Sequence, residues 1–196
     1  MEIASALILG GGQSVRMKYD KKYLEIDGVK LIDSLIARLR FIFSEILVSS
    51  NTPFDYDGVT VLRDEIGAGP LAGIYQGLKH CKSEYLYVIA CDMPFVSPEY
   101  VQYMSETVRA AQADICVSSI DIGLYEPFNS FYGKRCLAPI HDMLICGEYK
   151  IIPLFNKVKT WVVDPSIVAR FNSRGDMFFN INCQEDLERW KKRRFC

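Results

Sequence analysis

The chain alternates short apolar runs with segments of helical spacing, and this alternation limits its fold more than any other feature. Runs rich in Ile, Val, Leu and Tyr recur at about residues 3–9, 45–49, 59–62, 85–91 and 114–118. Most neighbouring runs are separated by a segment whose apolar residues repeat every three or four positions. Such alternation is typical of βαβ units. The sequence therefore predicts an α/β fold on a parallel sheet.

The first three helical segments each present one apolar face. One begins at Leu31, and a second follows Gly69 and Pro70. A third follows Ser97, which is a good N-cap with Pro98 at the first helical position. Beyond residue 120 the pattern loosens, and we expect a strand over 128–132, a helix over 134–146, a strand over 160–163 and a capped helix start at Asn182.

Length and charge exclude several classes of protein. The 196 residues suit one α/β domain spanning 1–196, and 49% hydrophobic residues are enough for a core. A net charge of −1 gives no general attraction to nucleic acid or to a membrane surface. The seven cysteines are odd in number and lack a C-x-x-C pair, which favours reduced core thiols. With no signal-like N-terminus, we expect a cytoplasmic protein.

Three glycines, Gly10, Gly11 and Gly12, directly follow the first apolar run. Glycines after a buried strand let the backbone approach a ligand closely and turn amide groups toward a phosphate chain. Val15 stands where a P-loop or a dinucleotide fingerprint would need another glycine, so neither motif is present. The alternative is a plain glycine turn in solvent.

Cations follow the glycines in a loop long enough to fold over a bound anion. Arg16 and Lys21 are the two that we expect to lie against several phosphates. Their charges would stabilise the negative charge that a leaving pyrophosphate develops. The sequence thus predicts a triphosphate site between the glycine turn and this loop.

Polar residues end three further apolar runs, and we expect them to share one edge of the sheet with the glycine turn. Asn51, Asp64 and Asp92 stand at these run ends. Ligands of open α/β sheets bind outside the carboxyl ends of the strands. Asp92 follows the very apolar run at 85–91, and one carboxylate together with substrate phosphates suits Mg²⁺. The alternatives are a helix or turn cap for Asp92 and ordinary turn residues for Asn51 and Asp64.

With these residues in view, the chain resembles the MobA family of nucleotidyltransferases, the molybdenum cofactor guanylyltransferases. The resemblance covers nearly the whole chain and rests on motifs in a fixed order. They are "LGGGQSVRM" at 9–17, "DKKYLEIDG" at 20–28, "GPLAGI" at 69–74, "CDMPF" at 91–95 and "FNINCQEDL" at 179–187. The family pattern has a His-Pro-Thr stretch where "YEPFNSFYGK" stands at 125–134 in this chain.

The resemblance implies a Rossmann-like three-layer αβα sandwich with a mostly parallel central sheet, in a cytoplasmic enzyme. The implied reaction transfers GMP from Mg²⁺-GTP to the terminal phosphate of molybdopterin and releases pyrophosphate. Molybdopterin-handling proteins and apo-molybdoenzymes are the protein contacts that we expect. Residues of about 1–118 would bind the nucleotide and residues of about 119–196 the acceptor.

The resemblance also implies roles for single residues, both for those already selected at the strand ends and for further ones. Leu9, Gly10, Gly11 and Gly12 would contact the guanine nucleotide, as would Asn51 and Asp64. Catalysis would fall to Lys21 and Arg16 on the triphosphate and to Asp92 as the metal ligand. The acceptor-side candidates are Lys150, Asn180 and Asn182. A helix cap is the alternative for Asn182, and a solvated loop is the alternative for Lys150.

Other functions stay open at this point. One alternative is a cytidylyltransferase that acts on the same pterin, or another small-acceptor nucleotidyltransferase. A different class would be a non-catalytic module that binds nucleotide or cofactor and delivers it. Lys21 and Asp92 argue against such an inactive site.

Overall fold

The computed structural model describes residues 5–10, 25–26, 28–51, 56–173, 175–181, 185–186 and 188–189. Its elements, in chain order, are β1 (Ser5–Leu9), β2 (Glu25–Ile26), β3 (Val29–Lys30), α1 (Leu31–Arg40), β4 (Glu45–Ser49), β5 (Thr60–Leu62), α2 (Gly69–His80), β6 (Tyr85–Ala90), α3 (Pro98–Ala110), β7 (Ile115–Asp121), β8 (Leu124–Gly133), the 3-10 turn η2 (Lys134–Cys136), α4 (Leu137–Ile145), the 3-10 turn η3 (Ile152–Asn156), β9 (Thr160–Val163) and α5 (Pro165–Phe171).

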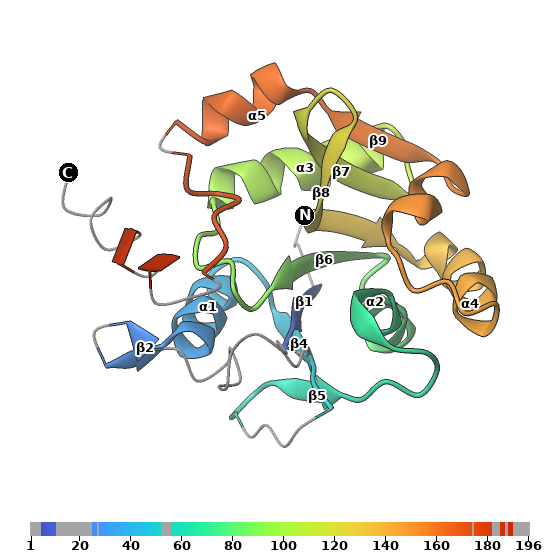
Figure 1. Cartoon of the computed structure of the whole chain (residues 1–196), viewed down its shortest axis with the longest axis horizontal. Helices are drawn as coiled ribbons and strands as arrows, with labels where there is room; N and C mark the ends of the chain where they lie inside the picture. Colours follow the sequence, from blue (N-terminus) through green and yellow to red (C-terminus); the bar gives the residue numbers. More distant parts are fainter. Residues whose placement is uncertain are drawn as a thin grey trace.

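A seven-stranded sheet in the order β5-β4-β1-β6-β8-β7-β9 forms the centre of the molecule (Figure 1). Within this sheet, β8 runs antiparallel to its neighbours β6 and β7, and the other described strand pairs are parallel. The reversal follows from a tight two-residue turn between β7 and β8, in which Gly123 has φ +74°. The predicted mostly parallel sheet is confirmed.

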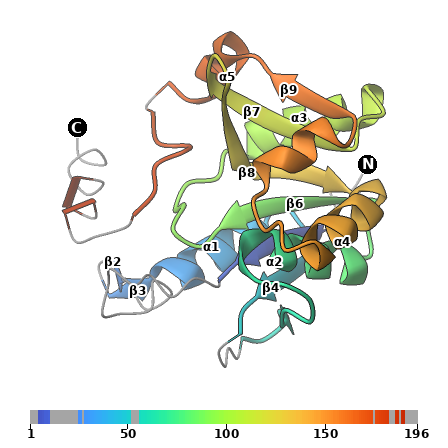
Figure 2. The same ribbon diagram turned by 45° about the vertical axis from the view of Figure 1, so that its right-hand side comes forward.

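Helices cover both faces of the sheet, which gives the three predicted layers (Figures 1 and 2). Side chains alternate along the buried strands. Ala6 and Ile8 of β1 pack in one core with α1 and α3. Leu7 and Leu9 pack in the other core with α2 and α4. Runs that are apolar at every position are therefore central strands buried on both faces.

Most predicted elements are confirmed within a few residues. Ser97 caps α3, because its Oγ accepts a hydrogen bond from the amide of Tyr100 at 3.2 Å. The helix predicted over 134–146 is the short turn η2 followed by α4. The hairpin β2–β3, the turn η3 and the helix α5 are additions that the sequence pattern did not predict, because each is too short to show a period.

None of the five cysteines within the described ranges forms a disulfide. Cys81, Cys91, Cys116 and Cys136 are buried, and Cys146 is exposed. Burial raises the pKa of Cys116 to about 12, so this thiol is held in its unreactive protonated form. Among the described helices, none combines the length and the apolar character that a membrane span requires.

Helix α2 lies unusually close to the sheet because glycine forms its contact face. A Cβ atom on Gly77 would stand 2.7 Å from Cδ2 of Leu7 and 2.7 Å from Cδ2 of Leu86. Both leucines are fully buried and have no room to move.

We therefore expect Gly77→Val to lower the free energy of unfolding by about 2 kcal/mol or more, through overpacking. Urea denaturation of the purified variant measures the loss. Gln102→Val, at an exposed position of α3, controls for the helix propensity of valine. Equal effects of the two substitutions would show that the close contact of α2 is unimportant.

Candidate active site

The carboxyl ends of four parallel strands meet at one edge of the sheet. Leu9 of β1 pairs in register with Ser49 of β4 and with Ala90 of β6. Ser49 pairs in turn with Leu62 of β5. The chain leaves these strands within two residues and reaches, at the same edge, Gly10, Asn51, Asp64 and Asp92. We call this set the carboxyl edge.

Gly10 lies against the neighbouring strand. Its amide donates a hydrogen bond to the carbonyl oxygen of Ser49 at 2.9 Å. A Cβ atom at this position would stand 3.3 Å from that oxygen and 3.3 Å from Cγ1 of Val48. A side chain is therefore disfavoured at Gly10, and the chain enters the glycine turn as bare backbone. Leu9, just before it, is buried in the core shared with α2.

Helix α2 reaches the same edge with Gly73. A Cβ atom there would stand 2.6 Å from Cδ2 of Leu9 and 2.7 Å from Oγ of Ser49. The helix therefore packs directly against the last residues of β1 and β4. The "GPLAGI" motif thus serves close helix packing beside the glycine turn.

Asn51 and Asp64 form a reciprocal pair. Nδ2 of Asn51 donates to Oδ2 of Asp64 at 3.0 Å, and the amide of Asp64 donates to Oδ1 of Asn51 at 3.0 Å. The pair ties the end of β4 to the end of β5. Oδ1 of Asp64 is buried and has no hydrogen-bond partner within the described ranges. One acceptor is therefore left for a ligand group that donates a hydrogen bond.

Asp92 is half-buried and follows β6, the strand of the carboxyl edge that borders β8. Its carbonyl oxygen accepts a hydrogen bond from the amide of Ile181 at 2.9 Å. The segment that carries Ile181 is also held by Asn129, whose Nδ2 donates to the carbonyl oxygen of Met177 at 3.0 Å. In Figures 1 and 2 this segment passes beside the connection from β6 to α3.

Asn180 precedes Ile181 and so lies next to Asp92 in space. Its Oδ1 atom is buried without a hydrogen-bond partner among the described residues. A buried amide oxygen in this state costs free energy unless a ligand satisfies it. The structure thus brings Asn180 to the carboxyl edge, although Asn180 and Asp92 are 88 positions apart in the sequence.

Glu126 is a buried acid on β8 that the sequence analysis did not select. It lies on β8 with 9% of its surface exposed, and Oε1 accepts a hydrogen bond from the amide of Phe128 at 3.1 Å. Burial raises the pKa of Glu126 to about 7, the Phe128 amide opposes this rise, and the negative charge of Asp92 adds to it. The only signal in the sequence was the departure of 125–134 from the family pattern.

Lys150 is exposed in the connection that follows α4. The preceding residue, Tyr149, lies beside Gly67, where a Cβ atom would stand 3.1 Å from Cε1 of the ring. Gly67 leads into α2, so Lys150 is placed on the α2–α4 side of the molecule. No described hydrogen bond or ion pair joins Lys150 to Asp92 or Asn180.

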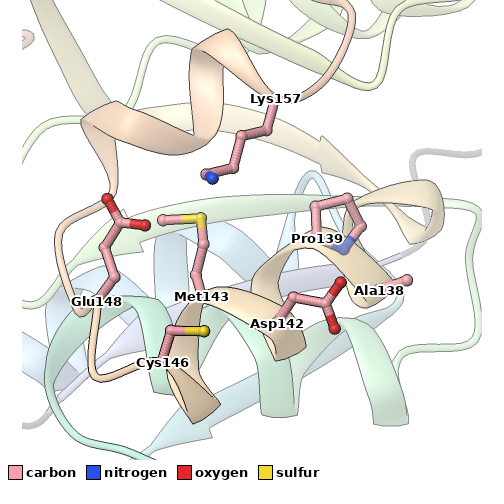
Figure 3. Close-up of a pocket in the computed structure, with 7 residues that line it drawn as sticks. All are labelled: Ala138, Pro139, Asp142, Met143, Cys146, Glu148 and Lys157. Atoms are coloured by element: carbon pink, nitrogen blue, oxygen red, sulfur yellow. The ribbon is translucent and has the colours of Figure 1, made fainter.

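A cavity of about 400 Å³ lies between α4 and η3 (Figure 3). Met143 from α4 and Lys157, which follows η3, point toward one another across it. Its wall is formed by Ala138, Pro139, Asp142, Met143, Cys146, Glu148 and Lys157, and none of the predicted site residues that the structure describes is among them. The carboxyl edge, not this cavity, carries the predicted chemistry.

Five of the predicted site residues lie outside the described ranges. They are Gly11, Gly12, Arg16, Lys21 and Asn182. Their assigned roles stay predictions.

Comparison with known proteins agrees with the resemblance found in the sequence. A family model described as the MobA-like NTP transferase domain matches residues 6–158. The molybdenum cofactor guanylyltransferase of Syntrophotalea carbinolica is 36% identical over 195 residues, which cover 98% of this chain and 92% of that protein.

Solved structures share the fold. The molybdopterin-guanine dinucleotide biosynthesis protein A from Archaeoglobus fulgidus has a TM-score of 0.84 at 24% identity, over 96% of this chain and 97% of that one. The 2-C-methyl-D-erythritol 4-phosphate cytidylyltransferase from Thermus thermophilus has a TM-score of 0.68 at 18% identity, over 98% of each chain. By its family model and by its near full-length similarity, the chain belongs to the MobA-like NTP transferase family.

Proposed function

We propose that the protein is a guanylyltransferase, which moves GMP from GTP to the terminal phosphate of molybdopterin. The observation that carries this proposal is the convergence of Gly10, Asn51, Asp64 and Asp92 at one edge of the sheet. The 36% identity with the guanylyltransferase of Syntrophotalea carbinolica supports guanine as the base and molybdopterin as the acceptor. The products are the guanine dinucleotide form of the cofactor and pyrophosphate.

The nucleotide binds along the first half of the carboxyl edge in this proposal. The backbone from Leu9 to Gly12 approaches the nucleotide closely, since the packing at Gly10 disfavours a side chain there. Asn51 and Asp64 hold each other in place, and the unpartnered Oδ1 of Asp64 accepts a hydrogen bond from the nucleotide.

Mg²⁺ is the proposed cofactor, and the residues at the edge fit it. Asp92 supplies a carboxylate, and Asn180 supplies a buried amide oxygen that lacks a partner. Oxygen ligands of this kind are those that Mg²⁺ takes in proteins, with substrate phosphates as further ligands. Within the described ranges no group of three or more His, Cys, Asp or Glu could hold a metal, so a closed structural site is not formed there. When bound, the ion neutralises and orients the triphosphate.

The protein contributes mainly position and charge to the reaction. An oxygen of the acceptor phosphate attacks the α-phosphorus of GTP, and the bond from that phosphorus to the β-phosphate oxygen breaks. Lys21 and Arg16 stabilise the negative charge that gathers on the departing pyrophosphate. No side chain forms a covalent intermediate in this scheme.

The second half of the chain is the proposed acceptor side. Residues of about 1–118 bind the nucleotide, and residues of about 119–196 bind molybdopterin. Asn180 supports this division, since its segment reaches the edge from the C-terminal half. Asn182 and Lys150 are the further acceptor contacts that we propose. Apo-molybdoenzymes in the cytoplasm are the proposed recipients of the product.

Product formation with two nucleotides tests the proposal. Purified protein is incubated with Mg²⁺, molybdopterin and either GTP or CTP, and the dinucleotide and pyrophosphate are quantified. We expect the rate of product formation with GTP to be at least about tenfold above the rate with CTP. Recognition of the base by a few kcal/mol gives a preference of this order or larger. Faster reaction with CTP would assign a cytidylyltransferase, and no pyrophosphate with either nucleotide would indicate a binding module.

A further inference from the structure

Strand β8 is irregular where it passes the end of β6. The β6–β8 ladder ends with Val88 opposite Ser130, and the β7–β8 ladder shifts its register between Glu126 and Phe131. The irregular stretch is held by its own side chains, since Oγ of Ser130 donates a hydrogen bond to the carbonyl oxygen of Glu126 at 3.0 Å. Irregularities of this kind often lie next to functional sites, where they redirect a side chain.

Asn129 is the residue that this irregular stretch redirects. Its φ of 56° lies in the left-handed region, which residues other than glycine rarely adopt. Its side chain is fully buried and bridges two parts of the chain. The hydroxyl of Tyr87 on β6 donates a hydrogen bond to Oδ1, and Nδ2 donates to the carbonyl oxygen of Met177 at 3.0 Å. A strained backbone persists only where its surroundings hold it, and these hydrogen bonds do so.

Met177 is fixed through both of its backbone polar groups. Its carbonyl oxygen accepts the hydrogen bond from Asn129, and its amide donates to Oδ1 of Asn172 at 2.9 Å. Its side chain is fully buried in the core shared with α1 and α3. Residues 175–181 form neither helix nor strand, so side chains satisfy the backbone groups that a ladder would otherwise pair. Asn129 thus joins this segment to β6 and β8.

The same segment ends beside Asp92. The amide of Ile181 donates to the carbonyl oxygen of Asp92 at 2.9 Å, which makes a second fixed point after Met177. Asn180 lies between the two points, and its Oδ1 is buried without a partner among the described residues. A short stretch held at both ends has few conformations open to it. The anchor at Met177 therefore helps to set where Asn180 stands.

We propose that Asn129 is a positioning residue of the acceptor side, which holds Asn180 beside Asp92 by way of Met177. The inference rests on the proposed function, in which the segment of Asn180 belongs to the molybdopterin half. Asn129 itself is fully buried, so it acts through the segment and not by touching a substrate. Its loss should therefore impair the use of molybdopterin more than the use of GTP.

Amide hydrogen exchange tests the positioning without any turnover. Asn129→Gly removes both hydrogen bonds, and glycine accepts the positive φ without strain. Exchange at the amides of Met177 and Ile181, measured relative to the amides of β1, should become about tenfold faster or more, as the loss of two ordinary hydrogen bonds gives. Val108→Ala is the matched control, because it leaves a cavity in the same core on α3 and alters no hydrogen bond of the segment.

Steady-state kinetics with Mg²⁺, GTP and molybdopterin test the functional part. In Asn129→Gly the KM for molybdopterin should rise about tenfold or more, because a small misplacement of a substrate-positioning group has effects of this size. The KM for GTP should change less, and Val108→Ala should alter neither value. If Asn129 acts through Asn180, the double variant Asn129→Gly/Asn180→Ala should be no worse than Asn180→Ala alone.

Tyr87→Phe is a milder second variant for the case that Asn129→Gly does not fold. It removes only the hydroxyl that donates to Asn129 and keeps the aromatic ring in the core. Exchange and the KM for molybdopterin should change in the same directions by smaller factors. A folded Tyr87→Phe protein with wild-type exchange and wild-type KM values would then overturn the inference.

The outcomes separate the inference from the proposed function. Faster exchange at both amides together with a selective rise of the KM for molybdopterin supports the inference. Exchange in Asn129→Gly that matches Val108→Ala overturns it. Equal changes in both KM values, no change in either, or a further loss in the double variant also overturn it and leave the proposed function standing. No product from the wild type refutes the proposed function and, with it, this role of Asn129.

Discussion

Replacing Asp92 with alanine is expected to lower the rate of guanine dinucleotide formation on the order of 100-fold or more. Asp92 follows the end of β6, next to β1 in the sheet, and its carbonyl oxygen is hydrogen-bonded to the amide of Ile181, the residue after Asn180. In the proposed mechanism, the loss of the Asp92 carboxylate removes the charge that would hold the cation against the triphosphate. The fold should survive, because the contact of Asp92 with Ile181 uses its backbone carbonyl and not its side chain.

The measurement is single-turnover formation of product from GTP and molybdopterin, with a thermal melt of each protein. Asp142→Ala provides the control, since Asp142 is an exposed acid on α4 at the separate cavity. A variant of Asp92 that melts like the wild type and keeps a rate within a few-fold of it would refute the metal assignment. An equal loss of rate in Asp142→Ala would mean that the loss of rate is not specific to the carboxyl edge.

The strand ends were predictable because they depend on local signals and on one rule of topology. Gly10, Asn51, Asp64 and Asp92 each follow an apolar run, and parallel strands end at a common edge. This prediction did not require the pairing register of the strands. Ser97 was predictable for a similar reason, since an N-cap followed by proline is a short-range signal.

Residues from the second half of the chain were harder to place. Glu126 is placed by β8, which pairs with β6 and β7 and shifts its register between Glu126 and Phe131. Asn180 reaches the edge through hydrogen bonds of a segment without regular structure. Neither position has a periodic signal, so the sequence suggested Asn180 only through a family motif and did not suggest Glu126.

Glu126 should also make the stability of the protein fall as the pH rises. In the unfolded chain this carboxyl group has its ordinary pKa of 4.5, and burial raises the pKa to about 7 in the folded protein. Between these two values the folded state binds more protons than the unfolded state, so the free energy of unfolding decreases with increasing pH. The contribution is complete below about pH 4.5 and is lost above about pH 7, with a total of about 3 kcal/mol.

Urea denaturation in the presence of EDTA, at pH 5 and at pH 8, measures this effect. Glu126→Gln has no carboxyl group to desolvate, so its stability relative to the wild type should increase by about 2 kcal/mol between the two pH values. Glu106→Gln alters an exposed carboxyl group and should show no comparable increase. A constant difference between Glu126→Gln and the wild type at both pH values would mean that Glu126 is well solvated in the folded protein, against its position on β8.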